Sequence, residues 1–147
     1  MYQRILVATD GSPLSKKAVA DAIDLAAAVG AELIALKVIP RYPQSYFEGS
    51  IPLSAEEVAK VEQHWTEDAR GVVDEVKELG EKKGVTVKAI LSKADVVSDA
   101  LIAAAKKHEV DLIVMASHGR KGIQRMLLGS ETQQVLTHSH IPVLVLR

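Results

Sequence analysis

The chain has no cysteine among its 147 residues, which excludes disulfides, thiol catalysis and cysteine-ligated zinc. Several enzyme motifs are missing as well. The five histidines lack HExxH spacing, no GxSxG elbow or GxxxxGK[ST] P-loop occurs, and no GxGxxG follows the first apolar run. These absences favour a binding site over a catalytic site, and we expect no catalytic and no metal-ligating residues.

Long hydrophobic runs are missing too. No stretch approaches the roughly 18 apolar residues of a spanning helix. The apolar run within "MYQRILVATDGS" is too short for a signal peptide, so we expect a cytoplasmic protein with no membrane contact. The net charge is −1, with acidic and basic residues interspersed, which argues against nucleic acid as a partner.

The composition, 48% hydrophobic and 25% charged, predicts one soluble globular domain over residues 1–147. Short apolar runs alternate with helical patterns, which is typical of βαβ units. Expected strands span 4–10, 31–40, 85–92, 111–117 and 141–147, and expected helices span 13–29, about 54–80, 95–108 and 130–138. This order predicts an α/β fold, an open doubly wound sheet of five parallel strands. Ligands of such sheets bind beyond the carboxyl ends of the strands.

The second expected helix is the longest. Ser54 and Glu57 form a capping box at its start, after an irregular segment from Pro40 to about Pro52. Apolar residues then recur at helical spacing, at Val58, Val61, Trp65, Val72, Val76 and Leu79. This stripe predicts that the helix buries Trp65, the only tryptophan.

The segment "TDGSP" follows the first expected strand. Asp10 is placed at the ligand edge of the sheet, next to a helix N-terminus that supplies free N–H donors. Its carboxylate could accept a hydrogen bond from a base amino group or a ribose hydroxyl. The alternative is that Asp10 and Ser12 only cap the first helix.

The segment "MASHGRKGIQRMLLGSETQQ" follows the fourth expected strand. Gly129 and Ser130 stand at a helix N-terminus, where amides and a hydroxyl can bind phosphate. Charge could be neutralised by Arg120, Lys121 and Arg125, and His118 could touch a ligand. The alternative is a solvated connection. His138 and His140 flank a helix end and are expected to be structural.

Five segments, "ILVATDGSP", "ALKVIP", "DLIVMASHGR", "LLGSETQQVL" and "IPVLVLR", together resemble the universal stress protein family, in order over essentially the whole chain. The resemblance implies strand order 3-2-1-4-5. It also implies a Rossmann-like sheet, similar to adenine nucleotide alpha hydrolases, with a nucleotide crevice between the first and fourth strands.

ATP-binding members of that family share a G-x2-G-x9-G-[S/T] loop. The spacing fits here when Ala116 takes the place of the first glycine, followed by Gly119, Gly129 and Ser130. The resemblance then implies ATP, with ADP or AMP as alternatives, bound together with Mg²⁺. Its implied contacts are Ala8, Thr9, Asp10, Val38, Met115, Ala116, Gly119, Gly129 and Ser130. The expected binding site also includes His118, Arg120 and Glu131, although the negative charge of Glu131 is unfavourable beside phosphates.

The resulting hypothesis is a cytoplasmic ATP-binding stress-response protein that acts as a nucleotide-dependent switch, with at most slow ATP hydrolysis. The apolar terminal run "VLVL" and the resemblance imply a homodimer through residues 141–147, the alternative being an interior strand. A second hypothesis is a dimeric interaction module that binds no nucleotide and signals through protein partners. A third, a phosphoacceptor receiver domain, is disfavoured by "TDGS" and "LSKAD" at its acidic positions.

Overall fold

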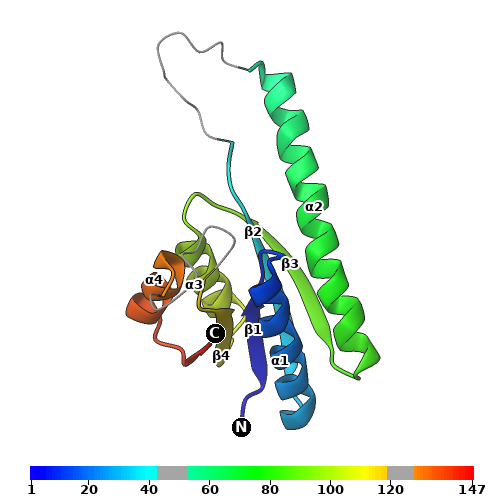
Figure 1. The fold of residues 1–147 in the computed structure, drawn as a ribbon, viewed down its shortest axis with the longest axis vertical. Coiled ribbons are helices and arrows are strands. Elements are labelled where there is room, and N and C mark those ends of the chain that lie inside the picture. The colour runs from blue at the N-terminus through cyan, green and yellow to red at the C-terminus, as the bar shows by residue number, and fades with distance from the viewer. Residues whose placement is uncertain (43–52, 119–127) are drawn as a thin grey trace.

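The computed structural model describes residues 1–42, 53–118 and 128–147. The strands are β1 (Arg4–Ala8), β2 (Glu32–Ile39), β3 (Val87–Lys93), β4 (Leu112–Ala116) and β5 (Val143–Leu146). The helices are α1 (Pro13–Val29), α2 (Ala55–Lys82), α3 (Val97–Lys107) and α4 (Ser130–His138). Each lies within about two residues of its expected range, so the predicted βαβ alternation is confirmed (Figure 1).

In the described residues, the five strands form one parallel sheet with the order β3-β2-β1-β4-β5. The predicted fold class and strand order are therefore confirmed. Receiver domains have the order 2-1-3-4-5, so the receiver hypothesis is wrong. The strand order reverses at β1, which has β2 on one side and β4 on the other. This junction is where doubly wound sheets bind ligands.

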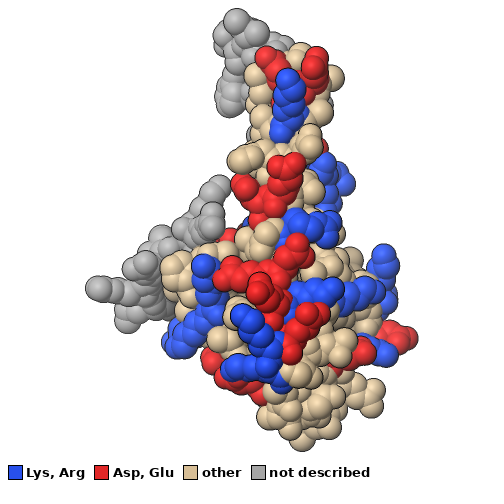
Figure 2. Space-filling view, turned by 90° about the vertical axis from the view of Figure 1, so that its right-hand side faces the viewer, with Lys and Arg blue, Asp and Glu red and all other residues tan. Residues whose placement is uncertain are grey.

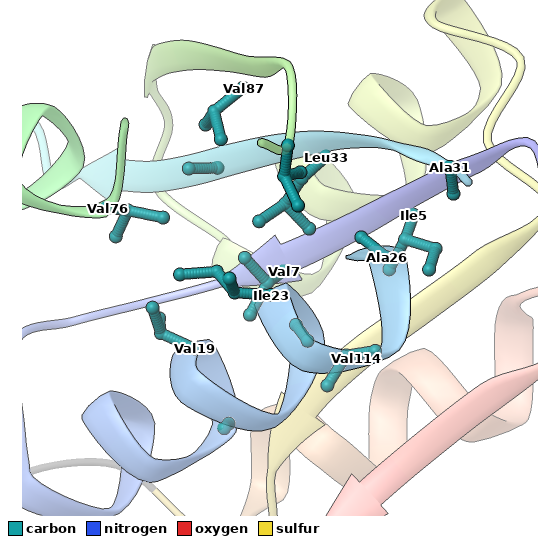
Figure 3. Packing of buried hydrophobic residues seen from close by; sticks show 14 of the residues in the cluster. Ile5, Val7, Val19, Ile23, Ala26, Ala31, Leu33, Val76, Val87 and Val114 are labelled. Carbon is teal, nitrogen blue, oxygen red and sulfur yellow. The ribbon is translucent and has the colours of Figure 1, made fainter. Parts of the chain in front are cut away.

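Both faces of the sheet are buried. On one face, Ile5 and Val7 of β1 pack against α1 and α2, as Figure 3 shows for Val19, Ile23 and Val76. On the other face, the cluster contains Leu6, Leu36, Val38, Leu101, Ile113, Met115 and Val135, contributed by β1, β2, β4, α3 and α4. Because successive side chains of a strand point to opposite faces, a central strand must be apolar at successive positions, as β1 is from Ile5 to Ala8.

The expected burial of Trp65 is wrong. The predicted capping box of α2 is present, with Ser54 and Glu57 bonded reciprocally at 2.8 and 3.1 Å. The helix buries Ala69, Val73, Val76 and Gly80, whereas Val58, Val61 and Val72 of the predicted stripe are half-buried and Leu79 is 43% exposed.

Trp65 is not fully buried because α2 is longer than the sheet on which it packs. A 28-residue helix is about 42 Å long, and the eight residues of β2 span only about 26 Å. The N-terminal half of α2 therefore extends past the sheet (Figure 1). There Trp65 is half-buried and stacks on Tyr42, with ring centroids 6.0 Å apart. Nearby, Lys93 donates a hydrogen bond to Glu62, which lowers the pKa of the Glu62 carboxyl below its ordinary value.

The two glycines of α2 differ in their surroundings. A Cβ on Gly80 would overlap Cγ2 of Val87, whereas one on Gly71 meets no described atom within 4 Å. We expect Gly80→Ala to lower the free energy of unfolding by about 1 kcal/mol, because overpacking outweighs the gain in helix propensity. Gly71→Ala should instead raise it by up to about 1 kcal/mol. Urea denaturation of both variants tests this; equal shifts of the same sign would contradict it.

The described surface carries mixed charge. Figure 2 shows acidic and basic side chains interspersed over the face in view, with no continuous basic patch among the residues it colours. This agrees with the net charge of −1. None of the helices in the described ranges has the length and apolar character needed to cross a bilayer.

Candidate functional site

The candidate site lies where β1 ends before its neighbours. The ladder of β1 with β2 stops at the pair Ala8 and Leu36, and that with β4 stops at Val7 and Val114. Both neighbours continue beyond these pairs, to Ile39 in β2 and Ala116 in β4. Among the described residues, the carboxyl ends of β2 and β4 thus have no strand partner on the sides that face each other, beyond the end of β1.

Val38 lies on β2, two residues beyond its last pair with β1. Backbone groups of β2 alternate in direction. The carbonyl of Leu36 accepts from the Thr9 amide on the β1 side at 3.0 Å, and that of Ile39 accepts from the Ala94 amide on the β3 side at 3.1 Å. By this alternation, the N–H and C=O of Val38 point to the β1 side, where β1 has ended. Such groups need a partner such as water or a ligand.

Asp10 lies in the turn between β1 and α1. Its Oδ1 accepts a hydrogen bond from the Ser12 amide at 2.9 Å across Gly11, whose φ is +79°. Ser12 caps α1 and accepts from the Ser15 amide at 3.2 Å. Ser12 is therefore the cap of α1, as predicted, whereas Asp10 holds the turn before the helix through the amide of the cap residue. The bond from the Ser12 amide does not prevent Asp10 from binding a ligand, because a half-buried carboxylate can accept several hydrogen bonds.

Two hydroxyls make this turn rigid. Thr9 is 7% exposed and Ser15 is 3% exposed, and their Oγ atoms lie 3.2 Å apart. The Thr9 hydroxyl also accepts from the Gly11 amide at 3.3 Å. Sequence reasoning missed Ser15, although its place three residues after the Ser12 cap gives the local signal.

The end of β4 is bonded directly to the start of α4. The Gly129 amide donates to the Ser117 carbonyl at 2.7 Å. The Thr132 hydroxyl donates to the carbonyls of Ala116 and Ser117 at 2.9 and 3.3 Å. A Cβ on Gly129 would lie 3.2 Å from Cα of His118, so close backbone approach favours glycine there. Sequence reasoning missed Thr132, which is 2% exposed and shares a buried stripe with Val135.

These bonds determine which amides of α4 can meet an anion. The Gly129 amide is occupied by Ser117, and within the described residues no side chain caps the helix. The amides of Ser130, Glu131 and Thr132 in the first turn therefore remain as donors, with the positive end of the helix dipole behind them. Both Ser130 and Glu131 are exposed.

The remaining expected contacts fall into two groups, those within the described residues and those outside them. His118 is half-buried beside Gly129, with Nδ1 3.2 Å from the Ser117 hydroxyl. Ala116 lies within β4, paired with Leu146, and among the described residues Glu109 alone combines a side chain with positive φ. The Cβ of Ala116 therefore causes no left-handed strain. Met115 packs in the buried cluster that also contains Leu6 and Val38. The expected contacts Gly119 and Arg120, and also Lys121 and Arg125, lie outside the described residues.

No group of three or more histidine or acidic side chains that could hold a metal occurs in the described ranges.

A model of the universal stress protein family matches residues 1–147. Universal stress protein MJ0531 of Methanocaldococcus jannaschii is 32% identical over 149 residues, covering 100% of this chain and 83% of that protein. Universal stress protein YxiE of Bacillus subtilis is 30% identical and is covered completely.

A crystal structure of a universal stress protein in complex with cAMP superposes with a TM-score of 0.72, at 30% identity, over 99% of this chain and 97% of that one. That neighbour binds an adenine nucleotide on the same fold.

Proposed function

The chain belongs to the universal stress protein family, and we propose that it binds an adenine nucleotide where β1 ends between β2 and β4. The observation that carries the proposal is the early end of β1, which leaves the N–H and C=O of Val38 directed at the strand switch point. A purine edge offers the matching acceptor and donor. The related structure with cAMP supports this ligand class.

Each part of the nucleotide has a proposed partner. The adenine would pair with the backbone of Val38, and the ribose would donate its hydroxyls to Asp10. The phosphate would accept from the first-turn amides of α4 and from the Ser130 hydroxyl. Ala8, Thr9, Met115, Ala116 and His118 would line the site between these groups, with Gly119 and Arg120 contributing from the loop.

For the ligand itself we propose ATP, entering as its Mg²⁺ complex, with ADP and AMP as weaker candidates. The protein would act as a cytoplasmic nucleotide-dependent switch in a stress response. Hydrolysis should be slow at most, because the described residues contain no cluster that would position a metal together with an attacking water.

Compounds released on denaturing freshly purified protein test the ligand class. Mass spectrometry should identify an adenine nucleotide near one per chain. A different compound class at that stoichiometry would speak against the proposal. So would an empty site that also fails to bind added nucleotide, and this outcome would favour the second hypothesis, an interaction module of the same fold.

We also propose a homodimer through β5. This strand lies at the end of the sheet and pairs with β4, and Leu144 is 40% exposed. An apolar edge strand invites pairing with a second chain. Sedimentation equilibrium should give twice the 15.8 kDa chain mass for the wild type and a shift toward the monomer for Leu144→Lys. A monomeric wild type at micromolar concentration would contradict the dimer.

A further inference from the structure

We infer that the adenine ring lies on the α3 side of the sheet and that Val97, at the start of α3, forms one wall of the base site, an inference that rests on the proposed function. Val97 is not among the contacts that the sequence or the family resemblance implies. The inference follows from the different polarity of the two sheet faces at the end of β1.

The face covered by α1 and α2 is polar at the end of β1. Thr9 points to this face, and its hydroxyl lies 3.2 Å from that of Ser15 in α1. Lys37 of β2 points to the same face, by the alternation of side chains along the strand. Ala116 of β4 adds only a methyl group. A purine ring placed here would cover hydroxyl and ammonium groups, which is unfavourable for an apolar surface.

The face covered by α3 and α4 is aliphatic at the same level. The last residues of the three central strands on this face are Ala8, Val38 and Met115, and all three belong to one apolar cluster or pack against it. A base that pairs with the Val38 backbone extends over the end of β1, where the half-buried Ala8 has the smallest of the three side chains. Burial of the flat purine face against aliphatic side chains is favourable, so this is the side on which the ring should lie.

Val97 adds to this wall from the helix. It is the first residue of α3 and lies one turn before Leu101, which is fully buried, so both residues share the helix face that packs on the sheet. The chain enters α3 directly from the carboxyl end of β3, where the Ala94 amide donates to the Ile39 carbonyl at 3.1 Å. The first turn of α3 therefore lies at the ligand edge of the sheet. Val97 packs against the same cluster as Val38 but is only half-buried, so part of its side chain is open to a ligand.

The first test is calorimetric titration of nucleotide-free full-length protein with adenosine, AMP and ATP with Mg²⁺. Val97→Ala removes two methyl groups from the wall, so adenosine, AMP and MgATP should all bind about fivefold more weakly than to the wild type. The factor should be the same for each ligand, because each carries the same base. The matched control is Val96→Ala, the same change at the preceding residue, which is 49% exposed. Its affinities should stay within about twofold of the wild type.

The second test locates the ring directly, by NMR of protein isotope-labelled at the methyl groups of valine and leucine. With AMP bound, the Val97 methyl groups should show nuclear Overhauser effects to the ring protons of adenine, and Val97→Ala should remove these signals. Leu14 reports on the other side, because it lies half-buried in the first turn of α1 and packs against the cluster of the opposite face.

Nuclear Overhauser effects from the adenine ring to Leu14 in place of Val97 would overturn the inference and leave the nucleotide site standing. Unchanged affinity of Val97→Ala for all three ligands would do the same. A loss confined to AMP and MgATP also overturns it, because Val97 would then act on the phosphate and not on the base. If the wild type binds none of the ligands, the proposed function fails and the inference fails with it.

Discussion

Asp10→Ala is expected to weaken adenine nucleotide binding by about 10- to 100-fold, the effect of losing hydrogen bonds to a charged acceptor. The substitution removes the proposed ribose acceptor. It also removes the acceptor for the Ser12 amide, which orients the turn between β1 and α1. Calorimetric titration with MgATP measures the change in Kd.

A second variant separates these two roles. Asp10→Asn retains a carbonyl oxygen that can accept from Ser12, so the fold should be unaffected while nucleotide affinity falls by about tenfold through loss of charge. Asp95→Ala is the control, because Asp95 is exposed and pairs with Arg41 at 3.4 Å, after β3. An Asp10→Ala protein that binds within about twofold of the wild type would refute the ribose role.

Leu6→Ala is expected to lower the free energy of unfolding by about 2–5 kcal/mol. Leu6 is fully buried on the central strand, in the cluster with Leu101 and Ile113. Truncation leaves a cavity that the surrounding strands cannot close, because β1 is bonded on both sides. A domain of this kind has about 5–15 kcal/mol in total, so the loss would be a large fraction of its stability.

Leu79→Ala provides the matched control. It makes the same chemical change at a leucine that is 43% exposed near the C-terminal end of α2. Its expected cost is about 0.5–1 kcal/mol, because little area leaves water when the chain folds around it. Equilibrium unfolding in urea gives both values. Similar losses of unfolding free energy in the two variants would contradict the full burial of Leu6 in the core.

The fold could be predicted from the sequence because its signals are local and agree with one another. Continuous apolar runs such as 5–8 require cover on both faces, and Ser12 with Pro13 begins α1 at the expected residue. Trp65 could not be placed in the same way. Its helical spacing is correct, but the depth at which a residue is buried depends on how far α2 extends past the sheet.

The candidate site was only partly predictable. Turn and cap chemistry identifies Asp10 and Gly129 from the residues around them. The direction of the Val38 N–H and C=O could not be predicted in this way. It depends on where β1 ends relative to β2, which is a property of the register between strands. The bond from Thr132 to Ala116 joins residues 16 positions apart, and no local pattern indicates it.

The central claim, that this chain binds an adenine nucleotide at the end of β1, is tested most directly by calorimetric titration of nucleotide-free protein with ATP and Mg²⁺. Saturable binding at one nucleotide per chain is expected, weakened by Asp10→Ala and unchanged by Asp95→Ala. No saturable heat up to millimolar ATP, with adenosine and AMP equally silent, would contradict it.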